Sequence, residues 1–134
     1  MHLNVHSHKS REKLNSKCDI YLVDTYGETK KFLKISKIAF LGGSIIDHRG
    51  HNPFEAVRLG CRVIHGPHIS NHLEAFKLLN KIKIATKVSN VFDAKKVIIR
   101  DINNQSNTKK IEKKLIKIAN KILIKNLKEL ERFI

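Results

Sequence analysis

The chain has 134 residues, with 27 Lys and Arg side chains against 12 Asp and Glu, and a formal net charge of +15. This length suits one domain with a real core and leaves no room for a second, while the positive charge favours an anionic partner. Two cysteines make neither a disulfide framework nor a zinc motif. The first residues lack the apolar core of a signal peptide, and no run approaches the roughly 20 apolar residues of a spanning helix. We therefore expect this protein to reside in a reducing cytosol.

The N-terminal part of the chain gives few structural signals. Residues 1–18 are polar and without a clear period, and we expect a poorly ordered loop there. Residues 19–23 favour β-structure and predict a short buried strand. After a turn at residues 24–28, residues 29–36 predict a short helix. Its modest apolar face would consist of Phe32, Leu33 and Ile35.

The next segment, residues 40–71, holds five of the six glycines and both prolines. Residues 38–41 form a short apolar run, which predicts a strand that ends in the sequence Gly-Gly-Ser. Asn52 then precedes Pro53, a pair typical of a helix start, and the predicted helix covers residues 53–59. The order strand, glycine loop, helix predicts a functional loop.

Further along, strands and helices continue to alternate. Gly60 predicts a helix stop before a strand at residues 62–65. A helix is expected from Ser70 or Asn71 to about residue 79, with Leu73, Phe76, Leu79 and the stem of Lys77 facing inward. A strand is expected near residues 84–88 and a short helix at residues 93–100. This alternation predicts an α/β fold with a parallel sheet and right-handed crossovers.

The C-terminal part is predicted to be a polar linker, residues 101–107, and a long basic helix, residues 108–133. Lysines cover one face of this helix, and apolar residues form a broad stripe on another. The main stripe consists of Ile111, Leu115, Ile118, Ile122, Leu130 and Phe133. We therefore divide the chain into an N-terminal segment (1–18), a Rossmann-like part (19–100) and a C-terminal linker and helix (101–134).

The loop at residues 42–52 and the helix after it are candidates for phosphate binding. A helix N-terminus at the carboxyl end of a parallel strand presents free N–H groups to an anion. Its dipole contributes about 0.5–2 kcal/mol, whereas a ligand held at about 0.1–1 mM needs roughly 4–5.5 kcal/mol. Side chains must supply the rest. Ser44, His51 and Asn52 can donate hydrogen bonds, and Glu55 can accept them; the alternative is an ordinary turn.

Other functions find less support in the residues. His48 and His51, or His68 and His72, lie close in sequence but have no acidic or cysteine partner at ligand spacing, so no metal and no cofactor is expected. No nucleophile motif of a hydrolase is present. The lysine face of the last helix could lie on anionic lipids or be a solvated face. No nucleic-acid partner is expected, because only bulk charge favours one.

Four sequence motifs together resemble 3-deoxy-D-manno-octulosonic acid (Kdo) transferase. They are DTYGE (24–28), AFLGGS (39–44), GHNPFEAVRLG (50–60) and GPHISN (66–71), in the order and spacing of that family's donor half. The resemblance is strong over residues 19–79. It departs from the family at Thr29, where Leu is usual, at the polar residues 47–49, and in the absence of an upstream Pro-Arg motif.

The resemblance implies a partial Rossmann-like domain, the C-terminal half of a GT-B glycosyltransferase that moves Kdo from CMP-Kdo to lipid A precursor (lipid IVA) in lipopolysaccharide biosynthesis. The enzyme would work at the cytoplasmic face of the bacterial inner membrane, in peripheral contact with its anionic lipids, or in the cytoplasm. No metal is implied. The donor pocket would contain Gly27, Glu28, Gly43, Ser44, Gly50, His51, Asn52 and Glu55, with Gly66, His68 and Asn71 near it.

The family's general base belongs to its N-terminal acceptor domain, so we expect no catalytic residue in this chain. The sequence begins inside the donor domain on this comparison. Three readings are open: the product of a split or decayed gene, a C-terminal piece that works only with a separately encoded N-terminal half as partner, or a mis-called start. We expect little activity from this chain alone. The alternatives are a non-catalytic remnant that binds a nucleotide or another anion, and a small basic nucleic-acid-binding module.

Overall fold

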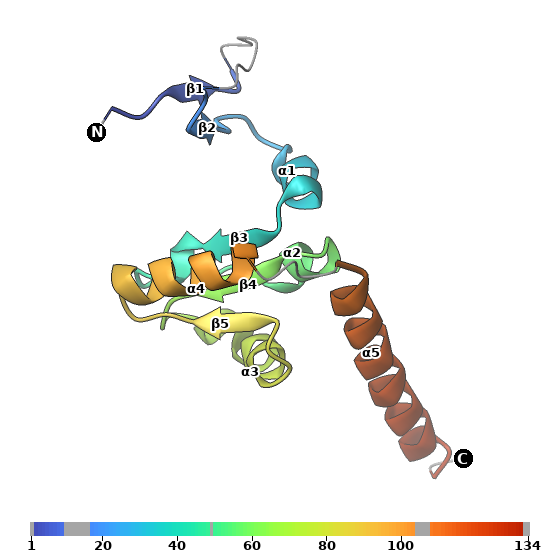
Figure 1. The fold of residues 1–134 in the computed structure, drawn as a ribbon. Coiled ribbons are helices and arrows are strands. Elements are labelled where there is room, and N and C mark those ends of the chain that lie inside the picture. Colours follow the sequence, from blue (N-terminus) through green and yellow to red (C-terminus); the bar gives the residue numbers. More distant parts are fainter. Residues whose placement is uncertain (1, 10–16, 49, 104–107, 133–134) are drawn as a thin grey trace.

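A computed structural model describes residues 2–9, 17–48, 50–103 and 108–132 (Figure 1). Its strands and helices follow one another along the chain with short connections. In chain order they are β1 (Val5–Ser7), β2 (Ile20–Leu22), α1 (Thr29–Ile35), β3 (Ile38–Leu41), the 3-10 turn η1 (Gly42–Ser44), α2 (Phe54–Arg58), β4 (Arg62–His65), the 3-10 turn η2 (Ser70–His72), α3 (Leu73–Lys81), β5 (Ala85–Lys87), α4 (Val91–Asn103) and α5 (Thr108–Leu130).

The main sheet consists of three parallel strands in the order β3-β4-β5. Ile38 pairs with Arg62, and Val63 pairs with Ala85, so the carboxyl ends of β3 and β4 meet at one edge. Helices α2 and α3 connect these strands, as crossovers between parallel strands require. The predicted α/β fold with a parallel sheet is confirmed, and the predicted bounds of β3 and β4 agree with the structure.

The core lies between this sheet and the helices that pack on it. Phe76 and Leu79 of α3, Val57 of α2 and Val63 of β4 are fully buried. Each such side chain contributes roughly 1.5–3 kcal/mol through burial. Cys61 is also buried, its thiol lies near the carbonyl oxygens of α1 residues, and burial raises its pKa. This thiol is part of the core.

A second, two-stranded sheet stands apart from the main one in Figure 1. Strand β1 pairs in parallel with β2, and Asn4 precedes β1 and accepts hydrogen bonds from the backbone of Asp19 and Ile20. A loop was expected over residues 1–18, and β1 within this segment differs from that expectation. The division of the chain into three parts stays a prediction.

Strand β2 was expected to be buried, and that prediction is wrong. Ile20 and Leu22 are exposed, because a two-stranded sheet offers them no second layer. Only the opposite face is covered, where Tyr21 packs on His8 and on Phe32 of α1 with ring centroids 5.8 and 5.7 Å apart. The aromatic contacts attach the small sheet to α1.

Two predicted apolar faces differ from the structure. In α1, Leu33 packs against the core but Ile35 is 79% exposed. In α3, Phe76 and Leu79 are buried as predicted, whereas Leu73 is exposed because the helix begins there, at the rim of the fold. Lys77 pairs with Glu74 at the surface instead of covering the core. In both α1 and α3, the buried face of the helix is therefore narrower than the apolar face that the sequence predicted.

Helix α4 is longer than predicted and includes part of the expected linker. Asp101, placed in the linker by the sequence, is a buried helical residue. Its carboxylate forms ion pairs with Arg62 and Arg100, each at 2.9 Å. Burial alone would raise the pKa of Asp101, but the two guanidinium groups outweigh it and lower the pKa. The predicted residues 104–107 of the linker lie outside the described part.

Helix α5 packs on the body only through its first half. Ile111 is buried in the core, and Leu115 packs beside it. From Ile122 onward the apolar side chains are exposed, and Leu130 is 60% exposed. Figure 1 shows this half of α5 extending away from the sheet. Two of the five described residues of the predicted stripe, Ile122 and Leu130, are therefore exposed; Phe133 lies outside the described residues.

None of the helices in the described part of the chain has the length and apolar character needed to cross a membrane.

Candidate functional site

Two loops meet at the carboxyl ends of β3 and β4, and Ser44 joins them. Its hydroxyl group donates to the carbonyl oxygen of Leu41 and accepts from the backbone N–H of Gly66 at 2.7 Å. Its own carbonyl oxygen accepts from the N–H of His68 at 2.9 Å. Ser44 is fully buried. The sequence suggested that Ser44 donates to a phosphate; in the structure its hydroxyl hydrogen is used within the protein.

Gly66 allows the two loops to approach each other this closely. A Cβ atom at this position would collide with the carbonyl group of Ser44 and would lie 2.9 Å from the Cα of Ile45. These are backbone atoms, so relief would require one loop to move. The small residue thus fixes the distance between the loops.

In the remaining loop, two described residues, Gly50 and His51, lie close to the ends of β3 and β4. The imidazole of His51 lies against Gly43, where an added Cβ would be 3.0 Å from its Nε2 atom. Gly50 has φ +74° and faces the carbonyl oxygen of His68, 3.0 Å from where its Cβ would be. Glycine is required at position 50 by both its backbone angle and its neighbour. The His51 ring is consequently held over the strand end.

Helix α2 begins at Phe54, and its N-cap residue is Pro53 instead of the predicted Asn52. The side-chain oxygen of Asn52 still accepts a hydrogen bond from the N–H of Phe54 at 3.0 Å, and Pro53 has helical backbone angles. The helix has only five residues, fewer than predicted, and one of its first N–H groups is already used by Asn52. A helix this short carries a small dipole, so side chains must provide most of any ligand affinity here.

A hollow of about 730 Å³ runs along β3 to its carboxyl end. It is lined by four of the predicted site residues, namely Gly43, His51, Asn52 and Glu55. Thr29, the residue after the predicted Gly-Glu pair, lies at its border. The size is that of a small-molecule site.

An adjoining hollow of about 520 Å³ shares Asn52 and Glu55 with the first. Lys30 of α1 and Arg58 of α2 also line it. These two cations can attract a phosphate, and sequence reasoning missed both. Arg58 lies within the GHNPFEAVRLG motif. The spacing from Glu55 to Arg58 puts the two residues on neighbouring turns of one helix. Lys30 gave no signal, because its approach to α2 depends on tertiary packing.

The other predicted site residues line neither hollow. Gly27 has φ +86° and nothing near its Cβ position. Glu28 pairs with Lys31 at 2.9 Å, and the hydrogen bond from Lys31 lowers its pKa. His68 lies 3.8 Å from Asp47, and Asn71 is exposed in η2. Their place in a donor pocket stays a prediction.

The histidines do not gather around a common point. Among the residues that the structure describes, no three His, Cys, Asp or Glu side chains are arranged to hold a metal ion. His65, at the end of β4, is buried with both ring nitrogens in hydrogen bonds, to the carbonyl oxygen of Gly66 and to Asn80. It stacks on Phe76 as part of the core.

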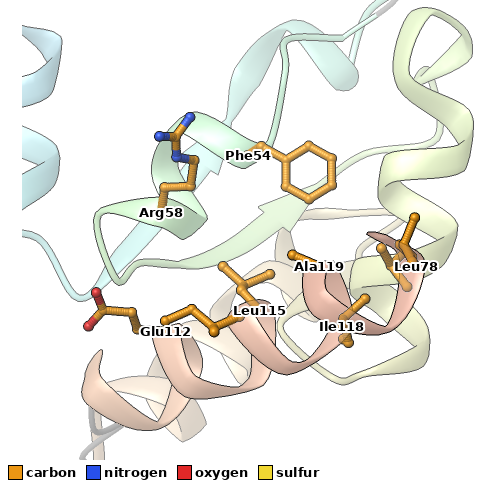
Figure 2. A pocket seen from close by; sticks show the side chains of 9 residues that line it. Phe54, Arg58, Leu78, Glu112, Leu115, Ile118 and Ala119 are labelled. Atoms are coloured by element: carbon orange, nitrogen blue, oxygen red, sulfur yellow. The ribbon is translucent and has the colours of Figure 1, made fainter. Parts of the chain in front are cut away.

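A third hollow, of about 490 Å³, separates α5 from α2 and α3 (Figure 2). Phe54, Leu78 and Leu115 line it, with Arg58 and Glu112 toward one end in Figure 2. This groove contains none of the predicted site residues. Its apolar lining reflects the incomplete packing of α5.

Comparisons with known proteins agree with the motifs. A 3-deoxy-D-manno-octulosonic acid transferase from Haemophilus influenzae is 31% identical over 125 residues, which cover 93% of this chain and 29% of that protein. The chain is related to the Kdo transferases. The transferase from Aquifex aeolicus is 33% identical over 94 residues, 63% of this chain and 27% of its own length. A probable mitochondrial Kdo transferase from Arabidopsis thaliana is 38% identical over 92 residues, 65% of this chain and 20% of its own length. No family model matches the chain.

The fold agrees with a solved structure as well. The C-terminal CMP-Kdo binding domain of WaaA from Acinetobacter baumannii superposes with a TM-score of 0.77 at 19% identity, and the match covers 87% of this chain and 61% of that one. The predicted Rossmann-like fold is thereby confirmed. The chain spans less than a third of the length of these curated Kdo transferases.

Proposed function

We propose that this chain is the donor-binding part of a Kdo transferase and binds CMP-Kdo in the hollow beside β3. The main support is that one cavity contains Gly43, His51, Asn52 and Glu55, which come from two of the four family motifs. The related fold in Acinetobacter baumannii is described as a CMP-Kdo binding domain. On this proposal His51 and Asn52 donate to the phosphate, and Glu55 accepts from a hydroxyl group of the donor.

The cations beside the cavity fit an anionic donor. Lys30 and Arg58 line the adjoining hollow, and the two hollows meet at Asn52 and Glu55. CMP-Kdo carries a phosphodiester and a carboxylate, so two negative groups need partners. Arg58 can bind one of these two negative groups through two parallel N–H bonds. Lys30 can pair with the other group as a point charge.

The proposed reaction transfers Kdo to lipid A precursor (lipid IVA). An oxygen of the acceptor attacks the anomeric carbon of Kdo, the bond to CMP breaks, and the hydroxyl proton passes to a base. We place that base and the acceptor site in a separately encoded N-terminal half, because the resemblance assigns the family's general base to an N-terminal acceptor domain and this chain spans less than a third of its curated relatives. Positioning of donor and acceptor supplies much of the rate of such reactions.

We further propose that the enzyme works at the cytoplasmic face of a bacterial inner membrane. The lysines of α5 and the exposed apolar side chains in its second half support peripheral contact with anionic lipids. The acceptor is itself a lipid, which places the reaction at a membrane surface.

Calorimetric titration with CMP tests donor binding. We expect saturable binding to this chain, and a loss of at least tenfold in affinity in Glu55→Ala. Glu74→Ala is the matched control, because Glu74 is an exposed acid in α3 away from the hollow. Equal affinity in all three proteins would refute the proposed site.

A transfer assay with CMP-Kdo and lipid IVA tests the reaction. We expect turnover only when an N-terminal Kdo transferase half is added. Turnover by this chain alone would overturn the proposal that it lacks the base, and no turnover despite CMP binding would favour a non-catalytic remnant.

A further inference from the structure

A second group of cations surrounds a separate hollow beside β5, an edge strand of the main sheet. The hollow has a volume of about 560 Å³. Its positively charged lining comes from four places in the chain: Arg62 opens β4, Lys83 precedes β5, Lys87 ends β5 and Arg100 belongs to α4. Asn80, Ala85 and Thr86 complete the lining.

Asp101 forms ion pairs with both arginines of this hollow, Arg62 and Arg100. Arg100 donates from its Nε atom to this carboxylate at 2.9 Å, and the Nε atom of Arg62 lies 2.9 Å from the other carboxylate oxygen in an ion pair. The Asp101 side chain is only 3% exposed, so it is buried beneath the guanidinium groups. Arg62 also donates from a terminal nitrogen to the carbonyl oxygen of Lys83 at 2.9 Å. The guanidinium groups therefore have fixed positions before any ligand arrives.

Lys83 has an unusual backbone conformation. It is the one non-glycine residue with positive φ, +59°, in the described part of the chain. It follows α3, where the left-handed conformation is usually taken by glycine or asparagine. Hydrogen bonds from Lys83 N–H to Asn80 and from Ile84 N–H to Leu79 hold this turn. The fold thus keeps a lysine where glycine would be less strained, at the border of the hollow.

The charges around the hollow are poorly balanced. Four cations face one carboxylate, which leaves three positive charges. Within the described ranges, no ion pair involves Lys83 or Lys87. Like charges at short distance repel each other, and a bound anion removes that repulsion. Thr86 and Asn80 add neutral side chains that can donate hydrogen bonds.

We propose that this hollow binds a phosphate group, either free or as a phosphomonoester. Guanidinium groups held in a fixed orientation match the geometry of phosphate oxygens. Lysines add charge at the open side. The site is distinct from the donor cavity, because the two hollows share no lining residue and β4 lies between β3, beside the donor cavity, and β5. It does not depend on the proposed transferase activity.

Titration with inorganic phosphate at constant ionic strength tests the site, with binding followed by calorimetry and by NMR shifts of the Thr86 and Lys87 amides. The variant combines Lys83→Asn with Lys87→Gln; both side chains are exposed, and asparagine tolerates the left-handed backbone. The control combines Lys125→Gln with Lys128→Gln in the exposed half of α5, for the same change in charge. Asn52→Ala tests independence from the donor cavity.

We expect saturable binding of phosphate that the variant weakens at least tenfold, while the control and Asn52→Ala keep their affinity. Equal loss in the control would show bulk charge attraction and would overturn the site, as would the absence of saturable binding. Glycerol 3-phosphate and vesicles containing phosphatidic acid then distinguish the source. Competition by the first identifies a soluble ester, and retention on the second identifies a lipid headgroup.

Discussion

The hydroxyl oxygen of Ser44 accepts a hydrogen bond from the N–H of Gly66 at 2.7 Å, and this bond joins the two loops that follow β3 and β4. Both residues are buried. The geometry of the candidate donor cavity therefore depends on a contact between positions 22 residues apart in sequence.

Gly66→Ala tests how tightly these loops are packed. The new methyl group would collide with the Ser44 carbonyl, so we expect a loss of about 3 kcal/mol in the free energy of unfolding. Chemical denaturation measures this loss. Gly42→Ala is the control, since its Cβ position has open space and its φ is not positive. A comparable loss in the control would contradict the steric argument.

Ser44→Ala removes the hydrogen bonds but keeps the volume nearly unchanged. The N–H of Gly66 would lose its buried partner, which costs about 1–3 kcal/mol. We expect the unfolding midpoint in urea to fall without a change in slope. If CMP affinity fell while stability stayed the same, Ser44 would contact the ligand directly, contrary to the structure.

Asn52 has two proposed roles that substitutions can separate. Asn52→Ala should cost about 1 kcal/mol of stability through loss of the hydrogen bond that its side chain accepts from the Phe54 N–H at the start of α2, and should also weaken CMP binding. Asn52→Ser should keep most of the stability, because serine caps a helix well, while its shorter hydroxyl cannot replace the amide donor to a phosphate. Denaturation and calorimetry on the same samples measure the two effects. Full CMP affinity in both variants would remove Asn52 from the donor site.

Asp101 makes stability depend on pH in the acid range. Its pKa is lower in the folded protein than its ordinary value of 3.8, so the unfolded chain binds the proton first as the pH falls. Its contribution is complete above about pH 5 and is lost as the pH falls through the folded pKa. Asp101→Asn should lower stability at pH 7 by about 3 kcal/mol. The variant should also lose less stability than the natural chain between pH 5 and pH 3, as measured by urea denaturation.

The exposed half of α5 should bind anionic vesicles. We expect co-sedimentation with vesicles of phosphatidylglycerol, weaker binding at high salt, and little binding to neutral phosphatidylcholine, since each lysine near such a surface adds at most about 1 kcal/mol. Leu123→Gln combined with Leu127→Gln should reduce binding, because both side chains are exposed. The pair Lys95→Gln and Lys96→Gln in α4 is the charge control. Equal binding by the leucine variant would exclude insertion of this face.

The sequence predicted the central elements well, for a local reason. Strands β3 and β4 are short apolar runs bounded by polar residues and glycine, so pattern alone locates them. The hydrogen bond between Asn52 and the Phe54 N–H at the start of α2 is equally local. The family motifs placed Gly43, His51, Asn52 and Glu55 together, and the structure brings these four to one cavity.

Long-range contacts account for what the sequence could not predict. In the sequence Asp101 resembles a linker residue, because its ion pair with Arg62 forms only in the folded chain. Ser44 resembles a free donor in the sequence, because its hydrogen bond with the Gly66 N–H depends on the packing of two separate loops. For α5, periodicity identifies the apolar face, but the length of the body decides how much of it is covered. None of these contacts can be predicted from the spacing of neighbouring residues in the sequence.

Within the part of the chain that the structure describes, β3 has no strand paired to its outer edge, and Phe40 on this strand is exposed. Unpaired peptide groups beside an exposed aromatic ring are a template on which a further strand can add. Concentrated solutions of the isolated chain are therefore susceptible to self-association through backbone pairing. Purification together with a polypeptide that supplies the neighbouring strand would protect this edge.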